Sequence, residues 1–142
     1  MSGNLTEAKE YLTCRGCTCA AFNGEKYIES FERGVRPLLD LIDSQISLSG
    51  FSVADRVVGK AAAFLYLKLK AKEIYAGVIS RPAVELLKNN GIPVKYDEQV
   101  EFIINRTNTG LCPMEESVLD AVNAEDAEKK IRAKLAALIS EK

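Results

Sequence analysis

The sequence contains no histidine among its 142 residues. Histidine is the usual general base near neutral pH and the commonest metal ligand. Its absence excludes Ser–His and Cys–His nucleophile pairs and every zinc site that needs an imidazole. Any catalysis would have to use carboxylates, lysine, cysteine, hydroxyl groups or a bound cofactor. The histidine count therefore removes many enzyme classes before any motif is considered.

An excess of one charge and a long apolar run are also missing. Nineteen Lys and Arg residues against 20 Asp and Glu residues give a formal net charge of -1, so no nucleic-acid partner is expected. The longest apolar run, AAAFLYL, is too short to cross a bilayer, and the polar N-terminus has no signal-peptide core. We expect no membrane partner and a cytoplasmic protein. A chain of this length can bury one core, so residues 1–142 are predicted to form a single domain.

Three of the four cysteines lie within the stretch TCRGCTCAAF. Cys112 could complete a four-cysteine zinc site with them, and the C-x-x-C spacing of Cys14 and Cys17 could form a redox pair. Structural zinc ligands usually come in separated pairs, and a reactive pair usually lies at a helix N-terminus, whereas a helix-like segment comes first here. We favour a β-hairpin in which CTCAAF and EKYIES flank an Asn-Gly turn. Cys17 and Cys19 would then share one buried face of the sheet, and no metal site is expected.

The remaining segments alternate between helical and strand patterns, which predicts an α/β fold. Ser52 and Asp55 form an S-x-x-D capping box, so the most distinctive helix is predicted to begin at Ser52. EIYAGVIS is typical of a buried central strand, and the β-helix-β spacing to the next strand predicts parallel neighbours. The predicted helices are 5–13, a segment beginning at Pro37, 52–71, 81–91, 111–122 and the C-terminal amphipathic helix 123–142 with Asn123 as its cap. The predicted strands are 17–22, 25–30, 73–80 and 92–100.

Candidate site residues follow from this order of elements. Ligands in open α/β folds bind beyond the carboxyl ends of the strands, near helix N-termini. Three segments are expected to meet there: the start of the Ser52 helix, the Ser80-Arg81 step and the polar stretch INRTNTGLCPMEE. Simpler explanations remain open, with Lys60 as a solvated helix edge, Asp55 as a helix cap and the polar stretch as an ordinary loop. The candidate ligand-binding residues are Asp55, Lys60, Ser80, Asn105, Arg106, Thr109, Cys112 and Glu115.

Several runs together resemble a known family. They are FERGVRPLLDLI, SVADRVVGKAAAFL, IYAGVIS, NNGIPV and INRTNTGLCPMEESV, and the resemblance extends over about residues 17–120, most of the chain. The chain is similar there to a small uncharacterised microbial family with a cytidine-deaminase-like fold. The resemblance implies a three-layer α/β/α sandwich with a central mixed sheet that begins with an antiparallel hairpin.

The sequence departs from true zinc deaminases at the motifs that carry their chemistry. Those enzymes use H/C-x-E at the start of one core helix and P-C-x-x-C at the start of the next. The positions that correspond to these two motifs are occupied here by Lys60-Ala61-Ala62 and by residues 80–85. Neither segment supplies the zinc-binding His or Cys of the motifs or the glutamate that transfers protons. Zinc-dependent deamination is therefore not expected.

The prediction from the sequence is a small-molecule-binding protein without catalytic zinc or another cofactor. Its ligand would be nucleotide-like, held in the former catalytic pocket by Asp55 and Lys60 and closed in by the stretch that ends near Cys112. One alternative is an enzyme of unassigned chemistry in which Lys60 or Cys112 acts in the same pocket. A second alternative is an oligomeric interaction protein, such as a homodimer that uses the apolar stripe of 123–142.

Overall fold

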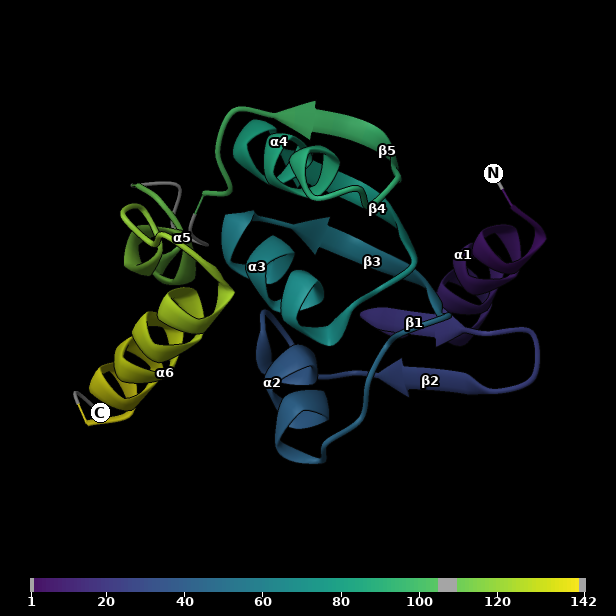
Figure 1. Ribbon diagram of the computed structural model, residues 1–142, viewed down its shortest axis with the longest axis horizontal. Helices are drawn as coiled ribbons and strands as arrows, with labels where there is room; N and C mark the ends of the chain where they lie inside the picture. Colours follow the sequence, from purple (N-terminus) through teal and green to yellow (C-terminus); the bar gives the residue numbers. More distant parts are fainter. Residues whose placement is uncertain (1, 105–109, 141–142) are drawn as a thin grey trace.

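A five-stranded mixed β-sheet lies at the centre of the protein, with helices on both of its faces (Figure 1). This computed structural model describes residues 2–104 and 110–140, and those residues form six helices besides the sheet. In chain order the elements are α1 (Gly3–Arg15), β1 (Cys19–Phe22), β2 (Tyr27–Ser30), α2 (Arg36–Asp43), β3 (Ser52–Val58), α3 (Lys60–Leu69), β4 (Glu73–Ser80), α4 (Arg81–Asn89), β5 (Val94–Val100), α5 (Pro113–Ser117) and α6 (Ala124–Ser140). The predicted α/β class with a mixed sheet is therefore confirmed.

The strands lie in the order β2-β1-β3-β4-β5. β1 is antiparallel to both of its neighbours, whereas β3, β4 and β5 are parallel to one another. The predicted hairpin is confirmed, and Asn23 Oδ1 accepts hydrogen bonds from the amides of Glu25 and Lys26 in its turn. Gly24 supplies the positive φ of 99° that this turn requires. The predicted parallel pairing of the strands that flank α4 is also confirmed.

The predicted helix at residues 52–71 is wrong in its first part. Residues 52–58 form β3, which pairs with β1 on one edge and with β4 on the other. Pairing on both edges suits this valine-rich segment and outweighs a local S-x-x-D pattern. The Ser52 hydroxyl donates to the carboxylate of Glu73 instead of capping a helix. The helix itself begins at Lys60.

The two faces of the sheet bury separate clusters of side chains. The cluster under α1 consists of Leu5, Ala8, Leu12, Cys17, Ala20, Ala54 and Tyr75. The larger cluster on the other face is built around α3, with contributions from the remaining helices. The prediction that Cys17 and Cys19 share a face is wrong, because Cys17 belongs to the α1 cluster and Cys19 to the larger one. Cys17 precedes β1, so the strict alternation of an extended strand does not apply to this pair.

α5 and α6 complete the larger core against α3. The amide of Asp126 donates to Asn123 Oδ1 at 2.8 Å, which confirms the predicted cap of the C-terminal helix. Lys68 on α3 pairs with Glu125 on α6 at 2.9 Å. The segment predicted as a helix over 111–122 forms the shorter α5, which lies near the N-terminal end of α3. None of the described helices is long and apolar enough to cross a bilayer.

Candidate functional site

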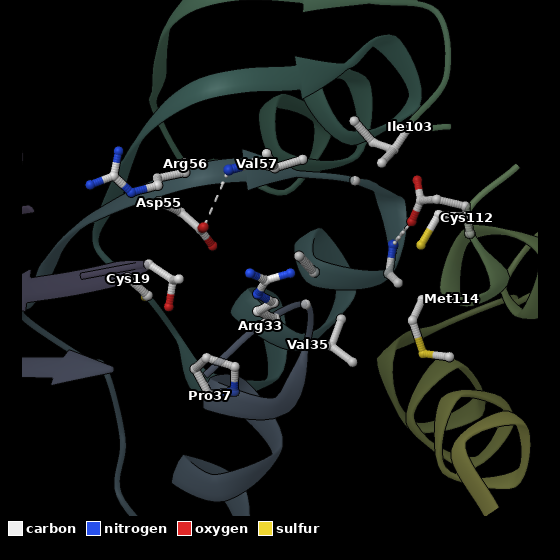
Figure 2. Close-up of a pocket in the computed structure, with 16 residues that line it drawn as sticks. Cys19, Arg33, Val35, Pro37, Asp55, Arg56, Val57, Ile103, Cys112 and Met114 are labelled. Carbon is white, nitrogen blue, oxygen red and sulfur yellow. Dashed lines mark hydrogen bonds between the residues drawn. The ribbon is translucent and has the colours of Figure 1, made fainter. Parts of the chain in front are cut away.

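A cavity of about 260 Å³ lies near the carboxyl end of β3, where β1, the segment before α2, the start of α3 and the segment around α5 meet (Figure 2). Figure 2 shows Cys19 and Asp55 at one end of the cavity and Cys112 and Met114 at the other. The wall is mostly apolar, and its apolar side chains include Val35, Pro37, Ala61, Ala62, Ile103 and Met114. This position agrees with the general location of ligand sites in open α/β folds.

Asp55 on β3 provides the polar group at the first end. Its Oδ2 accepts a hydrogen bond of 2.6 Å from the Tyr66 hydroxyl, which also lies 3.4 Å from the Cys19 sulfur. Its Oδ1 lies 3.4 Å from the amide nitrogen of Val57, beyond the usual range of about 2.7 to 3.2 Å for a strong bond. Burial raises the pKa of Asp55 to about 6, although these donors act in the opposite direction. This carboxyl group therefore retains unused accepting capacity next to the cavity.

Glu115 on α5 provides the carboxylate at the second end. Its two oxygens accept hydrogen bonds from the amides of Lys60 at 2.7 Å and Ala61 at 2.9 Å, the first two residues of α3. Glu115 is 8% exposed, and burial raises its pKa while the two amides act in the opposite direction. A carboxylate of the chain itself thus occupies the position at the α3 N-terminus where an anionic ligand would otherwise bind.

Gly59 makes the contact between Glu115 and α3 possible. A Cβ atom at this position would lie 2.4 Å from the carboxyl carbon of Glu115, far closer than two such atoms can approach. The backbone of Gly59 is extended, with φ of -98°, so a glycine is needed here for space and not for an unusual conformation.

Two arginines line the cavity and differ in what they bind. Arg56 is turned toward α1, where its Nε donates to the carbonyl of Cys17 at 2.8 Å and a terminal nitrogen donates to the carbonyl of Leu12 at 3.3 Å. Arg33 is exposed and lies on the segment before α2, and Figure 2 shows it directed into the cavity. Within residues 2–104 and 110–140, no hydrogen bond or ion pair occupies the Arg33 guanidinium. Arg33 is therefore available to a ligand.

Three of the residues predicted from the sequence meet in this cavity: Asp55, Cys112 and Glu115. Two others lie elsewhere. Ser80 is buried at the N-terminus of α4, where its hydroxyl accepts from the amide of Ala83 at 3.3 Å. Lys60 contributes its amide to the Glu115 contact, but its Nζ donates to the carbonyl of Leu119 at 3.3 Å outside the cavity.

The other three predicted residues, Asn105, Arg106 and Thr109, lie outside the described residues. The roles proposed for the predicted set remain predictions. Within the described ranges, no group of three or more Cys, Asp and Glu side chains is arranged to hold a metal ion.

The sequence interpretation missed Arg33, Tyr66 and the role of Cys19. Tyr66 had a usable signal, because a hydroxyl within the apolar run AAAFLYL must find a partner when that helix is buried. Cys19 and Arg33 had no such signal, since their places at the cavity depend on strand register and on the path of the chain between β2 and α2.

Comparison with known proteins agrees with this architecture. Residues 7–135 match a family described as a domain of unknown function, DUF1893, typified by TM1506. The chain is also similar to the crystal structure of a DUF1893 family protein (TM1506) from Thermotoga maritima, with 33% identity and a TM-score of 0.83. That similarity covers 96% of this chain and 91% of the other. No curated protein matches. Because the match spans most of the sequence, the chain belongs to the DUF1893 family.

Proposed function

We propose that the protein binds a nucleotide-like small molecule in the cavity between Asp55 and Arg33, without a metal ion. The observation that carries this proposal is the pair of charged groups without an ion-pair partner among the described residues, Asp55 and Arg33, in a mostly apolar cavity. Asp55 Oδ1 has the long 3.4 Å bond from the Val57 amide, and the Arg56 amide also acts on this carboxylate. Among the described residues, none pairs with Arg33. A cavity with apolar walls and a few converging polar groups is typical of small-molecule sites.

The sizes and charges of these groups favour a ring with an anionic substituent. The cavity volume of about 260 Å³ lies just below the range of about 300 to 1,000 Å³ for drug-sized ligands, so one heterocyclic ring system would fill it. Asp55 would accept hydrogen bonds from the ring, and Arg33 near the solvent would pair with a phosphate. Glu115 already fills the α3 N-terminus, which supports a phosphate at Arg33 and not at that helix.

The proposed scaffold is a cytidine-deaminase-like fold that has lost its zinc site. α3 follows β3 and α4 follows β4, so Lys60-Ala61-Ala62 and residues 80–85 lie at helix starts, as the resemblance implies. Neither segment contains the histidine or cysteine that the deaminase motifs use to bind zinc. A cytoplasmic location belongs to the same proposal and is consistent with four free cysteines, because disulfides are uncommon in that compartment.

The first test is a thermal-unfolding screen of freshly purified protein against bases, nucleosides and nucleotides, with elemental analysis for zinc on the same sample. We expect no stoichiometric zinc and a rise in Tm of several degrees with at least one nucleotide at saturation, because ligand at a hundredfold excess over Kd stabilises by about 2.7 kcal/mol. One zinc per chain, or a complete screen without stabilisation, would contradict the proposal.

A pair of arginine variants tests the phosphate contact. Arg33→Gln should weaken binding of a phosphorylated ligand about tenfold, because a charge-assisted hydrogen bond is lost, and should change the affinity for the matching nucleoside much less. Arg36→Gln is the matched control, since Arg36 is also exposed but does not line the cavity. Equal effects of the two substitutions would show that Arg33 does not contact the phosphate.

A further inference from the structure

The two carboxylates that line the cavity differ in the hydrogen bonds left for a ligand, and this difference restricts the ligand class. Both oxygens of Glu115 are bonded to α3 amides at 2.7 and 2.9 Å. Asp55 has one short bond, from Tyr66; its other donors are backbone amides, that of Val57 at 3.4 Å from Oδ1 and that of Arg56. A ligand that leaves Asp55 without a donor would cover a carboxylate that still needs one, which is unfavourable.

The orientation of the Asp55 carboxyl group is fixed before any ligand binds. Asp55 lies on β3 opposite Cys19 of β1, and the Tyr66 hydroxyl of α3 holds one of its oxygens. The Cys19 sulfur lies 3.4 Å from that hydroxyl. No lysine or arginine pairs with Asp55 in the described part of the chain, so its charge is left for the ligand to satisfy. Such an acceptor selects by the pattern of donors that a ring edge presents to it.

We propose, on the basis of the function proposed above, that the cavity selects a planar ring that presents two adjacent N–H donors to Asp55, as the N1–H and 2-amino edge of a guanine-type ring does. An ionised carboxylate only accepts hydrogen bonds, and each oxygen has two lone pairs, so Oδ2 can accept one ring donor beside the Tyr66 hydroxyl while Oδ1 accepts the adjacent one. The corresponding edges of adenine and cytosine each place an acceptor beside a donor, so that a lone pair would face the carboxylate. A hypoxanthine ring offers only one of the two donors.

The walls of the cavity are compatible with this ring. Ala61 and Ala62 are small, and with Val35 and Pro37 they leave apolar surface for the two faces of a flat heterocycle. Arg33 near the solvent would then meet the phosphate attached through the sugar, which places the ring toward Asp55. Base recognition by a carboxylate and phosphate recognition by an arginine thus use the two charged groups of the cavity that have no ion-pair partner among the described residues.

Three nucleotides that share their sugar and phosphate provide the test. Isothermal titration at pH 7.5 should show that guanosine 5′-monophosphate binds about tenfold more tightly than inosine 5′-monophosphate, which lacks the 2-amino group. The preference over adenosine 5′-monophosphate should be about ten- to hundredfold, the usual discrimination of a bidentate contact. The comparison isolates the ring edge, because every other contact is common to the three ligands.

Asp55→Asn converts the double acceptor into one acceptor and one donor. That pattern matches the edge of adenine, so the ratio of guanosine to adenosine nucleotide affinity should fall at least tenfold. Asp97→Asn is the matched control, since Asp97 also accepts a hydrogen bond from a tyrosine, Tyr75, but lies on β5 outside the cavity. The control should leave the ratio unchanged.

A second measurement, the pH dependence of the affinity ratio, uses the wild-type protein alone. It tests the role of Asp55 even if Asp55→Asn does not fold. With a pKa of about 6, Asp55 is mostly protonated at pH 5 and then offers a donor and an acceptor. The wild-type affinity ratio should therefore fall about tenfold between pH 7.5 and pH 5. The other titratable or charged groups that face this end are Cys19 and Tyr66, whose pKa values burial raises, and the two arginines Arg33 and Arg56. Glu115 and Cys112 lie at the other end and are common to all three complexes.

The outcomes separate the two proposals. Equal affinities for the three nucleotides, or an unchanged ratio in Asp55→Asn and at pH 5, would overturn the ligand class and leave the binding function intact. Failure of all three nucleotides and of the whole screen to bind would overturn both. A guanosine preference that Asp97→Asn keeps and Asp55→Asn loses would establish the assignment.

Discussion

Glu115 and Asp55 lie at the two ends of the cavity, and the chain uses these carboxyl groups in different ways. Glu115 crosses from α5 to α3 and has both oxygens bonded by backbone amides. Asp55 lies within the sheet, where one oxygen accepts from Tyr66 at 2.6 Å and the other has the longer 3.4 Å bond from the Val57 amide. Burial raises the pKa of both groups, so a perturbed pKa alone would not distinguish them. The hydrogen-bond partners do distinguish them, and this difference is the basis for proposing a structural role for Glu115 and a binding role for Asp55.

The largest expected effect is the loss of the Glu115 contact. Glu115→Ala should lower the free energy of unfolding by about 3 to 5 kcal/mol, because it leaves two amides of α3 without their buried charged partner. Glu116→Ala is the matched control, since Glu116 is exposed and forms an ion pair with Lys134 at 3.2 Å. The control should cost less than about 1 kcal/mol. Similar losses in chemical denaturation of the two variants would remove the structural role of Glu115.

The second effect is on the pH dependence of stability. Because burial raises the pKa of Asp55 to about 6, the folded protein holds this proton more tightly than the unfolded chain. Ionisation between about pH 4 and pH 6 therefore lowers the free energy of unfolding, by about 2 to 3 kcal/mol for this group. Asp55→Asn cannot ionise, so the variant should gain stability relative to the wild type as the pH rises from 4 to 7. Denaturant titrations at both pH values provide the measurement.

Tyr66→Phe provides a second test of the pH dependence that Asp55 gives to stability. The Tyr66 hydroxyl lowers the pKa of Asp55 by bonding its ionised form, so removing the hydroxyl should raise the pKa further. The pH window over which stability is lost should then extend above pH 6. A window that stays in place would mean that the hydroxyl does not hold the carboxylate.

The third effect tests why Gly59 is a glycine. Gly59→Ala should cost about 1 to 2 kcal/mol, because the new methyl group would displace the Glu115 carboxylate from the α3 amides. In a double-mutant cycle the same substitution should cost little once Glu115 is already alanine, since nothing remains to displace. Additive losses would show instead that Gly59 has a role independent of Glu115.

The smallest expected effect is at Lys60. Its Nζ lies outside the cavity at the carbonyl of Leu119, so Lys60→Met should change the free energy of unfolding by less than about 0.5 kcal/mol. Nucleotide affinity should change by less than about twofold, which is within 0.5 kcal/mol. A loss of binding above tenfold would place the ligand at the edge of α3 and not between Asp55 and Arg33.

Local sequence patterns predicted the elements whose signals lie within them. The Asn-Gly turn, the Asn123 cap and the β-helix-β spacing around α4 each correspond to the structure. The start of α3 could not be found in this way, because its cap is a carboxylate from Glu115 and the nearest local pattern was the S-x-x-D sequence that lies in β3. The opposite orientations of Cys17 and Cys19 depend in the same way on where β1 begins.

The candidate site was predicted in part for a related reason. Asp55, Cys112 and Glu115 were placed near helix starts and strand ends, and the structure brings them to one cavity. The different hydrogen-bonding roles of Asp55 and Glu115 were not predictable. They depend on the Tyr66 hydroxyl of α3 binding Asp55 and on the Glu115 carboxylate of α5 binding the first amides of α3. Hydrogen bonds between residues distant in sequence leave no periodic or local pattern.

The contact between Glu115 and α3 also sets an order of events during synthesis. The carboxylate follows the amides that it binds by 55 and 54 residues. At about 5 to 20 residues per second, a ribosome needs roughly 3 to 11 s to add that many residues. Throughout this interval the amides of Lys60 and Ala61 lack the carboxylate that binds them in the folded protein, so the first turn of α3 is completed only after Glu115 has been made.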